Sequence, residues 1–309
     1  MSEENDESSF SSSHEINPFS ELGDLDNDDD SCEQKNDNHL VTAASNRTAR
    51  KVRDWGLPTF QDQIDRGIQT LCLGPVDEKG EPLKGDYSSE GVILHLEHRL
   101  HSTGSDIWDS ALVLAHALYR PNILPTTSAG SELALLLQGK HVVELGSGTG
   151  AVGLFCAKCL GAQRAVLTDL PANLALLHKN SVSNGYRTQQ KEEPNGNAKV
   201  SIVSLDWTQV KLPEELNAEA FDIILGSDLF LPFAPEQLLR DLCRTLHQLL
   251  IQKRESLALI CYEERFDCSA FFKEAERLQL IVEKVPDDSL HPKFQDPGRI
   301  HLLKVTASH

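Results

Sequence analysis

A glycine-rich turn carries the clearest chemical signal in this 309-residue chain. It reads Glu144-Leu-Gly146-Ser-Gly148-Thr-Gly150. Glycine lets backbone amides approach a ligand closely, and the N-terminus of a following helix attracts polar and anionic groups. The turn therefore predicts a binding site for a nucleotide-containing cosubstrate. Read as Gly146-x-Gly148-x-x-Ala151, the same residues nearly match the dinucleotide fingerprint, so the turn by itself leaves both NAD and S-adenosylmethionine open.

An aspartate at the end of the next apolar run, Asp169, could serve the same cosubstrate. A carboxylate at a strand end can accept hydrogen bonds from both hydroxyls of a ribose, and both candidate cosubstrates contain one. Ligands of parallel α/β sheets bind beyond the carboxyl ends of the strands. We therefore expect one crevice to be surrounded by residues 146–150, 169, 207 and 227–228.

Alternating strand and helix patterns must position these residues. We predict strands over 141–145, 165–169, 200–207, 221–227 and 257–261, a closing pair over 280–285 and 300–305, and an earlier hairpin from 71–74 and 92–96. Helices are predicted over 109–119, 131–137, 151–160, 172–184, 235–251 and 269–278. The fold class is therefore α/β, a seven-strand sheet with helices on both faces and an antiparallel C-terminal strand pair.

Negative charge is concentrated near the N-terminus. The chain has a formal net charge of −18, and residues 1–50 hold thirteen Asp or Glu against three Lys or Arg, which leaves −8 for the rest. Residues 1–50 are expected to form a disordered acidic tail, because such a segment buries too little apolar surface to offset ordering entropy. Its simplest role is to solubilise the protein, although it could recruit a basic partner. Residues 51–309 then form one domain.

Composition excludes several classes of function. Phosphate contacts need clustered Lys and Arg, so no direct nucleic-acid binding is expected. No window reaches the roughly 18 apolar residues of a membrane-spanning helix. Seven cysteines, most of them in apolar runs and without a secretory signal, indicate the cytoplasm and also fit the nucleus. Cys156-x-x-Cys159 falls on one helix without a second ligand pair, so no metal site is expected.

Seven segments together give the chain a resemblance to a known family. They are Trp108-Asp-Ser-Ala111, Val143-Glu-Leu-Gly-Ser-Gly-Thr-Gly-Ala-Val-Gly153, Thr168-Asp-Leu170, Leu205-Asp-Trp207, Asp222-Ile-Ile-Leu-Gly-Ser-Asp-Leu229, Cys261-Tyr-Glu-Glu-Arg265 and Ile300-His-Leu-Leu303. With this pattern the sequence resembles methyltransferase family 16, the protein lysine methyltransferases. The resemblance implies a Rossmann-like class I methyltransferase fold, S-adenosylmethionine as the cosubstrate and a lysine on a partner protein, such as a chaperone, an AAA ATPase or a translation factor, as the methyl acceptor.

The resemblance also implies a set of cosubstrate-binding residues. They are Trp108, Gly146, Ser147, Gly148, Asp169, Trp207 and Ser227. The glycine turn would line the methionine end of the cosubstrate, and the aspartate would hold its ribose. The two tryptophans and Ser227 would wall the rest of the pocket, where aromatic surface suits both an adenine and a sulfonium cation.

The segment 227–231 departs from the family's pattern. Family members have an acidic residue there that is followed three positions later by an aromatic residue, usually Tyr, whereas here Asp228 is followed by Leu231. We assign Asp228 to the catalytic position, because a carboxylate can orient the acceptor ammonium and guide its deprotonation. Phe230 is a candidate wall of a hydrophobic substrate channel. Tyr262, Glu263 and Glu264 end the fifth predicted strand and could touch the substrate, but the simpler expectation is a solvated strand end.

Three alternatives stay open. Because no tyrosine hydroxyl stands at position 231, the acceptor could be an arginine or another group. A non-catalytic interaction module would keep the fold and lose the chemistry. An NAD-dependent oxidoreductase would share the glycine turn and Asp169, but nothing in the sequence resembles a Ser/Tyr/Lys reductase triad.

Overall fold

The computed structural model describes residues 68–72, 93–97, 107–118, 137–187, 199–231, 234–294 and 300–308. All of them belong to the second of the two units into which the chain divides, residues 54–309. The expected acidic tail at 1–50 and most of the expected helix at 131–137 lie outside the described residues. The domain boundary near residue 50 therefore stays a prediction.

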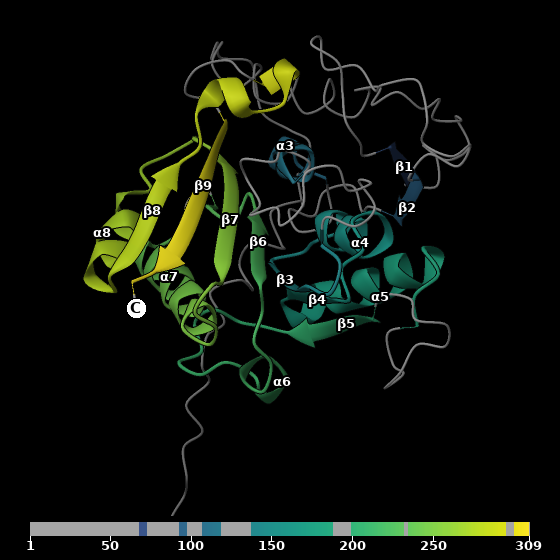
Figure 1. Cartoon of the computed structure of the whole chain (residues 1–309), viewed down its shortest axis with the longest axis horizontal. Coiled ribbons are helices and arrows are strands. Elements are labelled where there is room, and N and C mark those ends of the chain that lie inside the picture. Colours follow the sequence, from purple (N-terminus) through teal and green to yellow (C-terminus); the bar gives the residue numbers. More distant parts are fainter. Residues whose placement is uncertain are drawn as a thin grey trace, which may run out of the picture. The chain divides into compact units, whose positions relative to one another are not determined.

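Seven strands form the central sheet, as the sequence predicts (Figure 1). Their order is β5-β4-β3-β6-β7-β9-β8, and their bounds are β3 (His141–Leu145), β4 (Arg164–Asp169), β5 (Lys199–Ser204), β6 (Ile223–Ser227), β7 (Leu257–Glu263), β8 (Leu280–Lys284) and β9 (Ile300–Ala307). Neighbouring strands from β5 to β7 are parallel, whereas β9 runs antiparallel to both β7 and β8. The predicted fold class is confirmed. Within the closing pair, β9 lies between β7 and β8, so that β8 forms the edge of the sheet.

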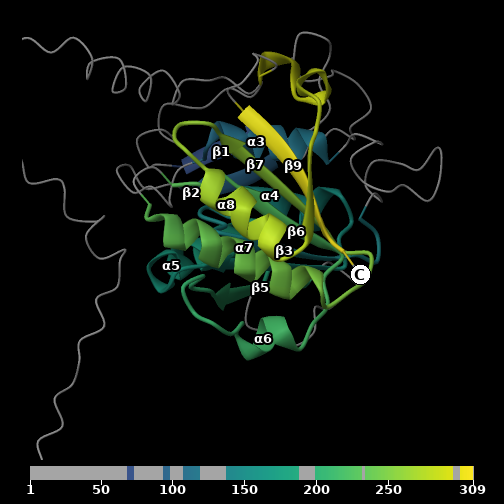
Figure 2. The same ribbon diagram turned by 90° about the vertical axis from the view of Figure 1, so that its left-hand side faces the viewer.

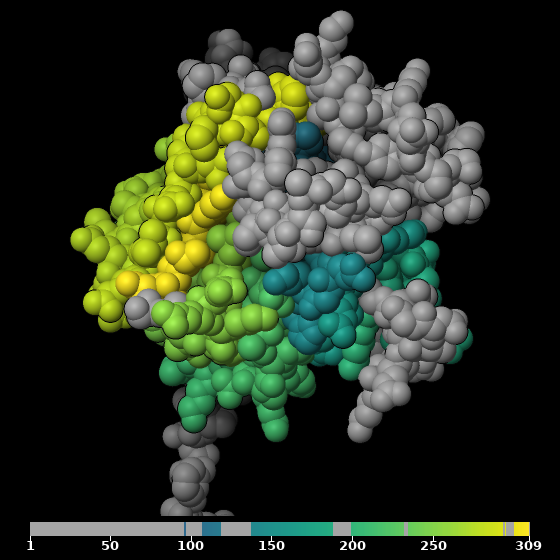
Figure 3. Space-filling model, viewed as in Figure 1, coloured from purple at the N-terminus to yellow at the C-terminus, as the bar shows by residue number. Residues whose placement is uncertain are grey.

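Six α-helices in the described part of the chain cover the two faces of this sheet. They are α3 (Asp109–Ala117), α4 (Ala151–Cys159), α5 (Leu174–Ser183), α6 (Glu214–Asn217), α7 (Glu236–Leu250) and α8 (Ser269–Arg277). The first three pack on one face and the last three on the other. Figure 2 shows α7 and α8 side by side in front of the sheet. In the space-filling view, their green residues and the yellow C-terminal residues lie next to each other on the surface (Figure 3).

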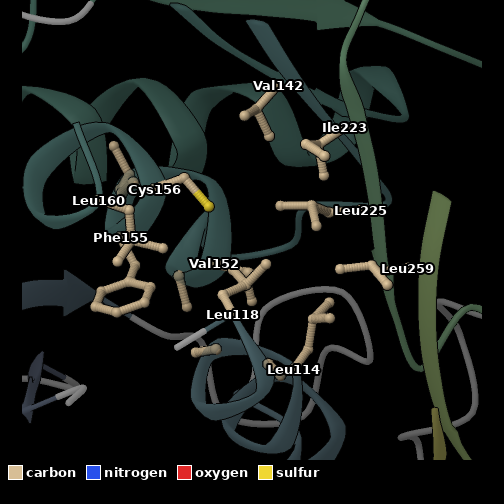
Figure 4. Close-up of a cluster of buried hydrophobic side chains, with 14 of the residues drawn as sticks. Leu114, Leu118, Val142, Val152, Phe155, Cys156, Leu160, Ile223, Leu225 and Leu259 are labelled. Atoms are coloured by element: carbon tan, nitrogen blue, oxygen red, sulfur yellow. The ribbon is translucent and has the colours of Figure 1, made fainter. Parts of the chain in front are cut away.

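Alternation along the strands divides the core into two layers, because successive side chains point to opposite faces. Val142 belongs to the layer under α3 and α4, whereas Val143 belongs to the opposite layer. Figure 4 shows part of the first layer, with side chains that include Leu114, Leu118, Val152, Phe155, Ile223, Leu225 and Leu259. Full burial of such a side chain contributes about 1.5–3 kcal/mol. This packing fixes α3 on the sheet, and with it Trp108 at the start of α3.

Strand β5 ends three residues earlier than predicted. The Leu205 N–H still donates to the Asp169 carbonyl over 2.9 Å. The Asp206 carboxylate then accepts hydrogen bonds from the Thr208 N–H at 2.9 Å and from its hydroxyl at 2.8 Å. Aspartate favours turns of this kind because its side chain bonds the backbone two residues on. Trp207 therefore sits in a turn at the carboxyl end of the sheet.

The predicted N-terminal hairpin is confirmed. β1 (Ile68–Cys72) pairs antiparallel with β2 (Ile93–Glu97), and Leu96 is fully buried in the first core layer. β2 contacts α4 and α5. Three short 3-10 segments complete the described structure: η4 (Pro171–Asn173), η5 (Asp287–Ser289) and η6 (Pro292–Phe294).

Candidate active site

The turn between β3 and α4 owes its shape to glycine. Gly146 and Gly148 have left-handed backbones, with φ of +55° and +53°. This conformation is strained for residues with a Cβ atom. A Cβ atom at Gly146 would also lie 2.8 Å from Leu229 Cδ2 and 3.3 Å from the Trp207 ring. The structure thus brings the predicted site residues Gly146 and Trp207 together.

The side chain of Ser147 is used within the fold. Its hydroxyl donates to the Glu144 carbonyl at 3.1 Å and accepts from the Thr168 N–H at 3.0 Å, while its own N–H donates to the Thr168 carbonyl at 2.8 Å. The serine therefore ties the glycine turn to the end of β4. Its predicted contact with the methionine end of the cosubstrate stays a prediction.

Asp169 lies directly beside the glycine turn. Its Oδ2 atom accepts the Gly148 N–H at 2.7 Å, and its Oδ1 atom accepts the Leu170 N–H at 2.7 Å and the Asn173 amide at 2.9 Å. Burial raises the pKa of Asp169, and these hydrogen bonds oppose the rise. A carboxylate has about four acceptor positions. One position on Oδ2 is therefore left for a ribose hydroxyl without displacing any of the three donors.

Glu144 is a buried acid at the same site whose role sequence reasoning missed. Its Oε2 atom accepts the Gly153 N–H at 3.0 Å, across from β3 to α4. Burial raises the pKa of Glu144 to about 8, against the opposing hydrogen bonds from Gly153 and Ser147. The side chain is therefore largely protonated at neutral pH. The signal in the sequence was a lone acid inside the apolar run 142–145.

Asp228 follows directly on β6 and is buried, with its side chain 3% exposed. It is one of two described non-glycine residues with a positive φ, at 58°. Its Oδ2 atom accepts a hydrogen bond from Arg265 Nη2 at 2.7 Å, and its Oδ1 atom accepts the Glu263 N–H at 3.3 Å. Burial raises the pKa of Asp228, although the Arg265 guanidinium opposes the rise. A buried acid of this kind at a strand end is typical of functional sites.

Arg265 joins three residues that come from different elements. Its Nη2 atom lies 2.7 Å from Glu263 Oε2 as well as from Asp228, and its Nε atom lies 3.1 Å from the same Glu263 oxygen. Its guanidinium carbon lies 4.9 Å from the centre of the Trp108 ring. Predicted site residues Trp108 and Asp228 are therefore connected through an arginine to which the sequence reasoning assigned no role.

The expected solvated strand end at 262–264 is wrong for two of its three residues. Tyr262 and Glu263 are buried, because β7 extends to residue 263 and its alternation turns Glu263 toward the α3 face. Only Glu264 is exposed, and it lies 2.7 Å from His301 Nε2.

The expectation for Phe230 is also wrong. Its ring is fully buried and packs on Tyr262 at 4.5 Å and on Phe271 at 5.0 Å between centroids, so it cannot line a substrate channel. The left-handed backbone at Asp228 redirects the chain, and Phe230 enters the core layer under α7 and α8. Leu231, where the family pattern has an aromatic residue, is half-buried.

The described geometry fits a nucleoside-containing cosubstrate. A glycine turn with no room for a Cβ atom, a strand-end carboxylate with a remaining acceptor position and the partly buried Trp207 lie together at the carboxyl ends of β3, β4 and β5. Ser227 ends the neighbouring β6 and is half-buried. These residues would hold the adenosyl and methionine parts of S-adenosylmethionine, and the individual contacts stay predictions.

The cysteine pair of α4 and the expectation about membrane-spanning helices concern residues outside this site. Cys156 and Cys159 are buried in α4, and the described residues contain no group of three or more His, Cys, Asp or Glu that could hold a metal ion. Among the helices that the structure describes, none is long and apolar enough to cross a membrane.

Comparison with known proteins gives consistent matches. The sequence model of a family described as lysine methyltransferase matches residues 88–278. Protein N-lysine methyltransferase METTL21A of Xenopus tropicalis is 30% identical over 224 residues, covering 70% of this chain and 90% of that protein. Calmodulin-lysine N-methyltransferase of Arabidopsis thaliana is 34% identical over 147 residues, covering 46% of this chain and 44% of the relative. Histone-arginine methyltransferase METTL23 of Rattus norvegicus is 32% identical over 145 residues, covering 47% of this chain and 51% of the relative. The chain thus spans about half the length of two of these relatives.

The order and directions of the seven strands are those of the class I methyltransferase fold that the sequence predicts. The chain belongs to the lysine methyltransferase family, whose sequence model matches more than half of its residues. The predictions of the family and of S-adenosylmethionine as the cosubstrate are thereby confirmed. The NAD-dependent alternative is not supported by any of the relatives reported above.

Proposed function

We propose that this chain transfers methyl groups from S-adenosylmethionine to a lysine side chain of a partner protein. The observation that carries the proposal is the buried carboxylate of Asp228 at the end of β6, one strand away from the glycine turn that ends β3. Family membership and relatives described as protein-lysine methyltransferases support it.

Each part of the site has a task in this reaction. When bound, S-adenosylmethionine supplies an activated methyl group. The glycine turn and Asp169 would fix its position, and Asp228 would draw in the acceptor ammonium and accept its proton, because only the neutral amine has a free electron pair. Burial makes Asp228 a better proton acceptor than a solvated aspartate, since its pKa is raised.

An arginine acceptor is a second candidate, and one observation favours it. Asp228 and Glu263 together already bind a guanidinium, that of Arg265, through Nη2 and Nε. Planar guanidinium groups match carboxylates in this way. The relative from Rattus norvegicus is described as a histone-arginine methyltransferase. Lysine remains the first choice because the matching family is described by that residue.

The partner and the compartment are narrower proposals. Relatives are described as lysine methyltransferases of calmodulin and of EEF1A, which supports a protein as the partner. A chaperone, an AAA ATPase or a translation factor stays our proposal for its class. We also propose a cytoplasmic location, with access to the nucleus, on the basis of the cysteines. Five of the seven lie in the described residues and are buried there.

Calorimetry and a transfer assay on the full chain test the proposal. S-adenosylmethionine and S-adenosylhomocysteine are expected to bind, whereas NADH is not. Incubation with tritiated S-adenosylmethionine and a cell lysate should then label protein bands, and hydrolysis of those bands should release methyl-lysine. Release of methyl-arginine would establish the second candidate. Cosubstrate binding without any labelled acceptor would favour the non-catalytic module.

A further inference from the structure

The corner formed by Asp228, Glu263, Arg265 and Trp108 carries a charge arrangement that the reaction alone does not explain. Two buried carboxylates, with side chains 3% and 9% exposed, share the guanidinium of Arg265, whose side chain is 23% exposed. The groups come from the end of β6, the end of β7 and the start of α3.

We infer that Arg265 is a positioning residue that holds the Asp228 carboxylate ionised and fixed in direction. The inference rests on the proposed function, because it takes Asp228 as the group that meets the acceptor. It extends the proposed function by stating what keeps Asp228 ionised and oriented toward the acceptor.

The charge balance supports this role. Two carboxylates that share a buried site without a cation cannot both stay ionised, and one of them then takes up a proton. A protonated Asp228 could neither attract an ammonium nor accept its proton. Arginine suits the task because its guanidinium keeps its charge at any physiological pH.

The geometry supports the positioning part. One nitrogen, Nη2, reaches both acids at 2.7 Å, and Nε holds Glu263 at 3.1 Å. The guanidinium also lies over the Trp108 ring at 4.9 Å, within the range of a cation–π contact. The guanidinium is therefore held at its edge by hydrogen bonds to the two acids and at its face by the Trp108 ring. A lysine in the same place would keep the charge but could not reproduce the fork and the stacking.

Among the described side chains around Asp228, Arg265 is the one whose charge favours the ionised form of Asp228. Glu263 is the nearest acid, and its presence raises the pKa of Asp228. From β7, the Cys261 thiol also faces Asp228, and burial and the Asp228 charge raise its pKa well above the usual value, so it stays neutral. From α3, Ser110 lies near Cys261 and carries no charge. Arg265 is the one cation paired with Asp228 among the described residues.

Three variants of the full chain separate charge from shape. Arg265→Gln removes the cation, Arg265→Lys keeps it without the fork, and the double variant Glu263→Gln with Arg265→Gln removes one charge of each sign. Arg277→Gln is the matched control, because Arg277 is an exposed arginine that pairs with Glu274 within α8.

The first measurement is the titration of the Asp228 carboxyl carbon by 13C NMR, assigned by comparison with Asp228→Asn. In Arg265→Gln the midpoint should rise by about one pH unit or more, because the opposing charge is lost. It should stay near the wild-type value in Arg265→Lys and Arg277→Gln, and it should move back toward that value in the double variant. An unchanged midpoint in Arg265→Gln would overturn the inference. If that variant does not fold, the titrations of Arg265→Lys and of the double variant decide.

The second measurement is methyl transfer as a function of pH, with cosubstrate affinity measured alongside. In Arg265→Gln, kcat at pH 7 should fall by about tenfold or more and recover partly at higher pH, as expected for a base with a raised pKa. The Kd of S-adenosylmethionine should change little. A merely structural role would lower the amount of folded protein without moving the pH profile, and that result would contradict the inference. If the wild type methylates neither lysine nor arginine, the proposed function fails, and the carboxyl titration still decides the role of Arg265.

Discussion

The two ends of β6 carry two aspartates with opposite surroundings. Asp222 precedes the strand and accepts hydrogen bonds from the His141 N–H at 3.0 Å, Lys140 at 3.2 Å and Lys253 at 2.6 Å. Burial raises its pKa, but these partners outweigh burial, and the pKa of Asp222 is lowered overall. Asp228 follows the strand, and there burial outweighs Arg265, so that its pKa is raised.

The same contrast holds for the two edges of the sheet. At the amino edge, the acids are paired with cations of the fold, as Asp222 is with two lysines and Glu219 is with Arg164 and His141. At the carboxyl edge, Glu144 and Asp169 form no ion pair within the described part of the chain, and burial raises the pKa of both. The acids named at the first edge are held by cations of the fold. At the second edge, Asp169 keeps an acceptor position for a ligand, whereas Asp228 and Glu263 share the cation Arg265.

The comparison is tested by replacing each of the two aspartates with asparagine, and the largest effect is expected at Asp228. Asp228→Asn keeps the shape of the side chain and removes its charge, and it should reduce methyl transfer by roughly 100-fold or more, because the proton acceptor is lost. Cosubstrate affinity should survive. Turnover is measured with tritiated cosubstrate, and affinity by calorimetry. Unchanged turnover would remove Asp228 from the acceptor site.

A second test separates cosubstrate binding from transfer. Asp169→Asn should weaken S-adenosylmethionine binding by roughly tenfold, because hydrogen bonds to a charged acceptor contribute about 1.5–3 kcal/mol and the amide retains only part of this. The amide oxygen can still accept the Gly148 N–H. Calorimetry should therefore show a higher Kd of S-adenosylmethionine for Asp169→Asn, and a Kd close to that of the wild type for Asp228→Asn. Equal affinities in wild type and Asp169→Asn would refute the ribose role.

The third test uses the pH dependence of stability. The pKa of Glu144 is raised to about 8 in the folded state. Its contribution to stability is therefore fully present below the unfolded-state pKa of about 4.3, and it is lost as the pH rises toward 8. Between these values the free energy of unfolding should fall by up to about 1.4 kcal/mol per pH unit from this group. Urea unfolding of Glu144→Gln over the same range should show a flatter profile, and parallel profiles would exclude the buried acid as the cause.

The smallest effect is expected at the amino end of β6. Asp222→Asn keeps an acceptor for the His141 N–H but loses the charge that faces two partly exposed lysines, so stability should fall by about 0.5–1 kcal/mol. Because the pKa of Asp222 is lowered, this contribution is present above pH ~3.9 and is lost as the pH falls through the folded-state value. Methyl transfer per folded molecule should equal that of the wild type. A loss of turnover would show that the two ends are not independent.

Most of the fold follows from local patterns. Apolar runs, helical periodicity and glycine positions predict every strand of the sheet and the five longer described helices to within about three residues at each end, because each of these elements buries a face that its own sequence marks. The glycine turn and Asp169 are likewise predictable, since a strand end that runs into glycines and a strand-end acid are local features.

The corner around Arg265 is not predictable in this way. Whether Glu263 is solvated depends on how far β7 extends, and the extension is set by its pairing with Ile300 on β9. The contact between Arg265 and Trp108 joins residues far apart in the chain and depends on how α3 packs against β7. Phe230 is buried because of one left-handed residue, and no hydropathy pattern marks that change of direction.

The left-handed backbone of Asp228 also limits which replacements can be interpreted at all. At φ of 58°, glycine, asparagine and aspartate are tolerated, whereas other residues are strained by about 1–2 kcal/mol. An alanine or glutamate scan at this position would therefore combine a backbone defect with a side-chain change. A library built to redirect the acceptor preference should vary the neighbours of residue 228 and hold this residue to the three compatible types.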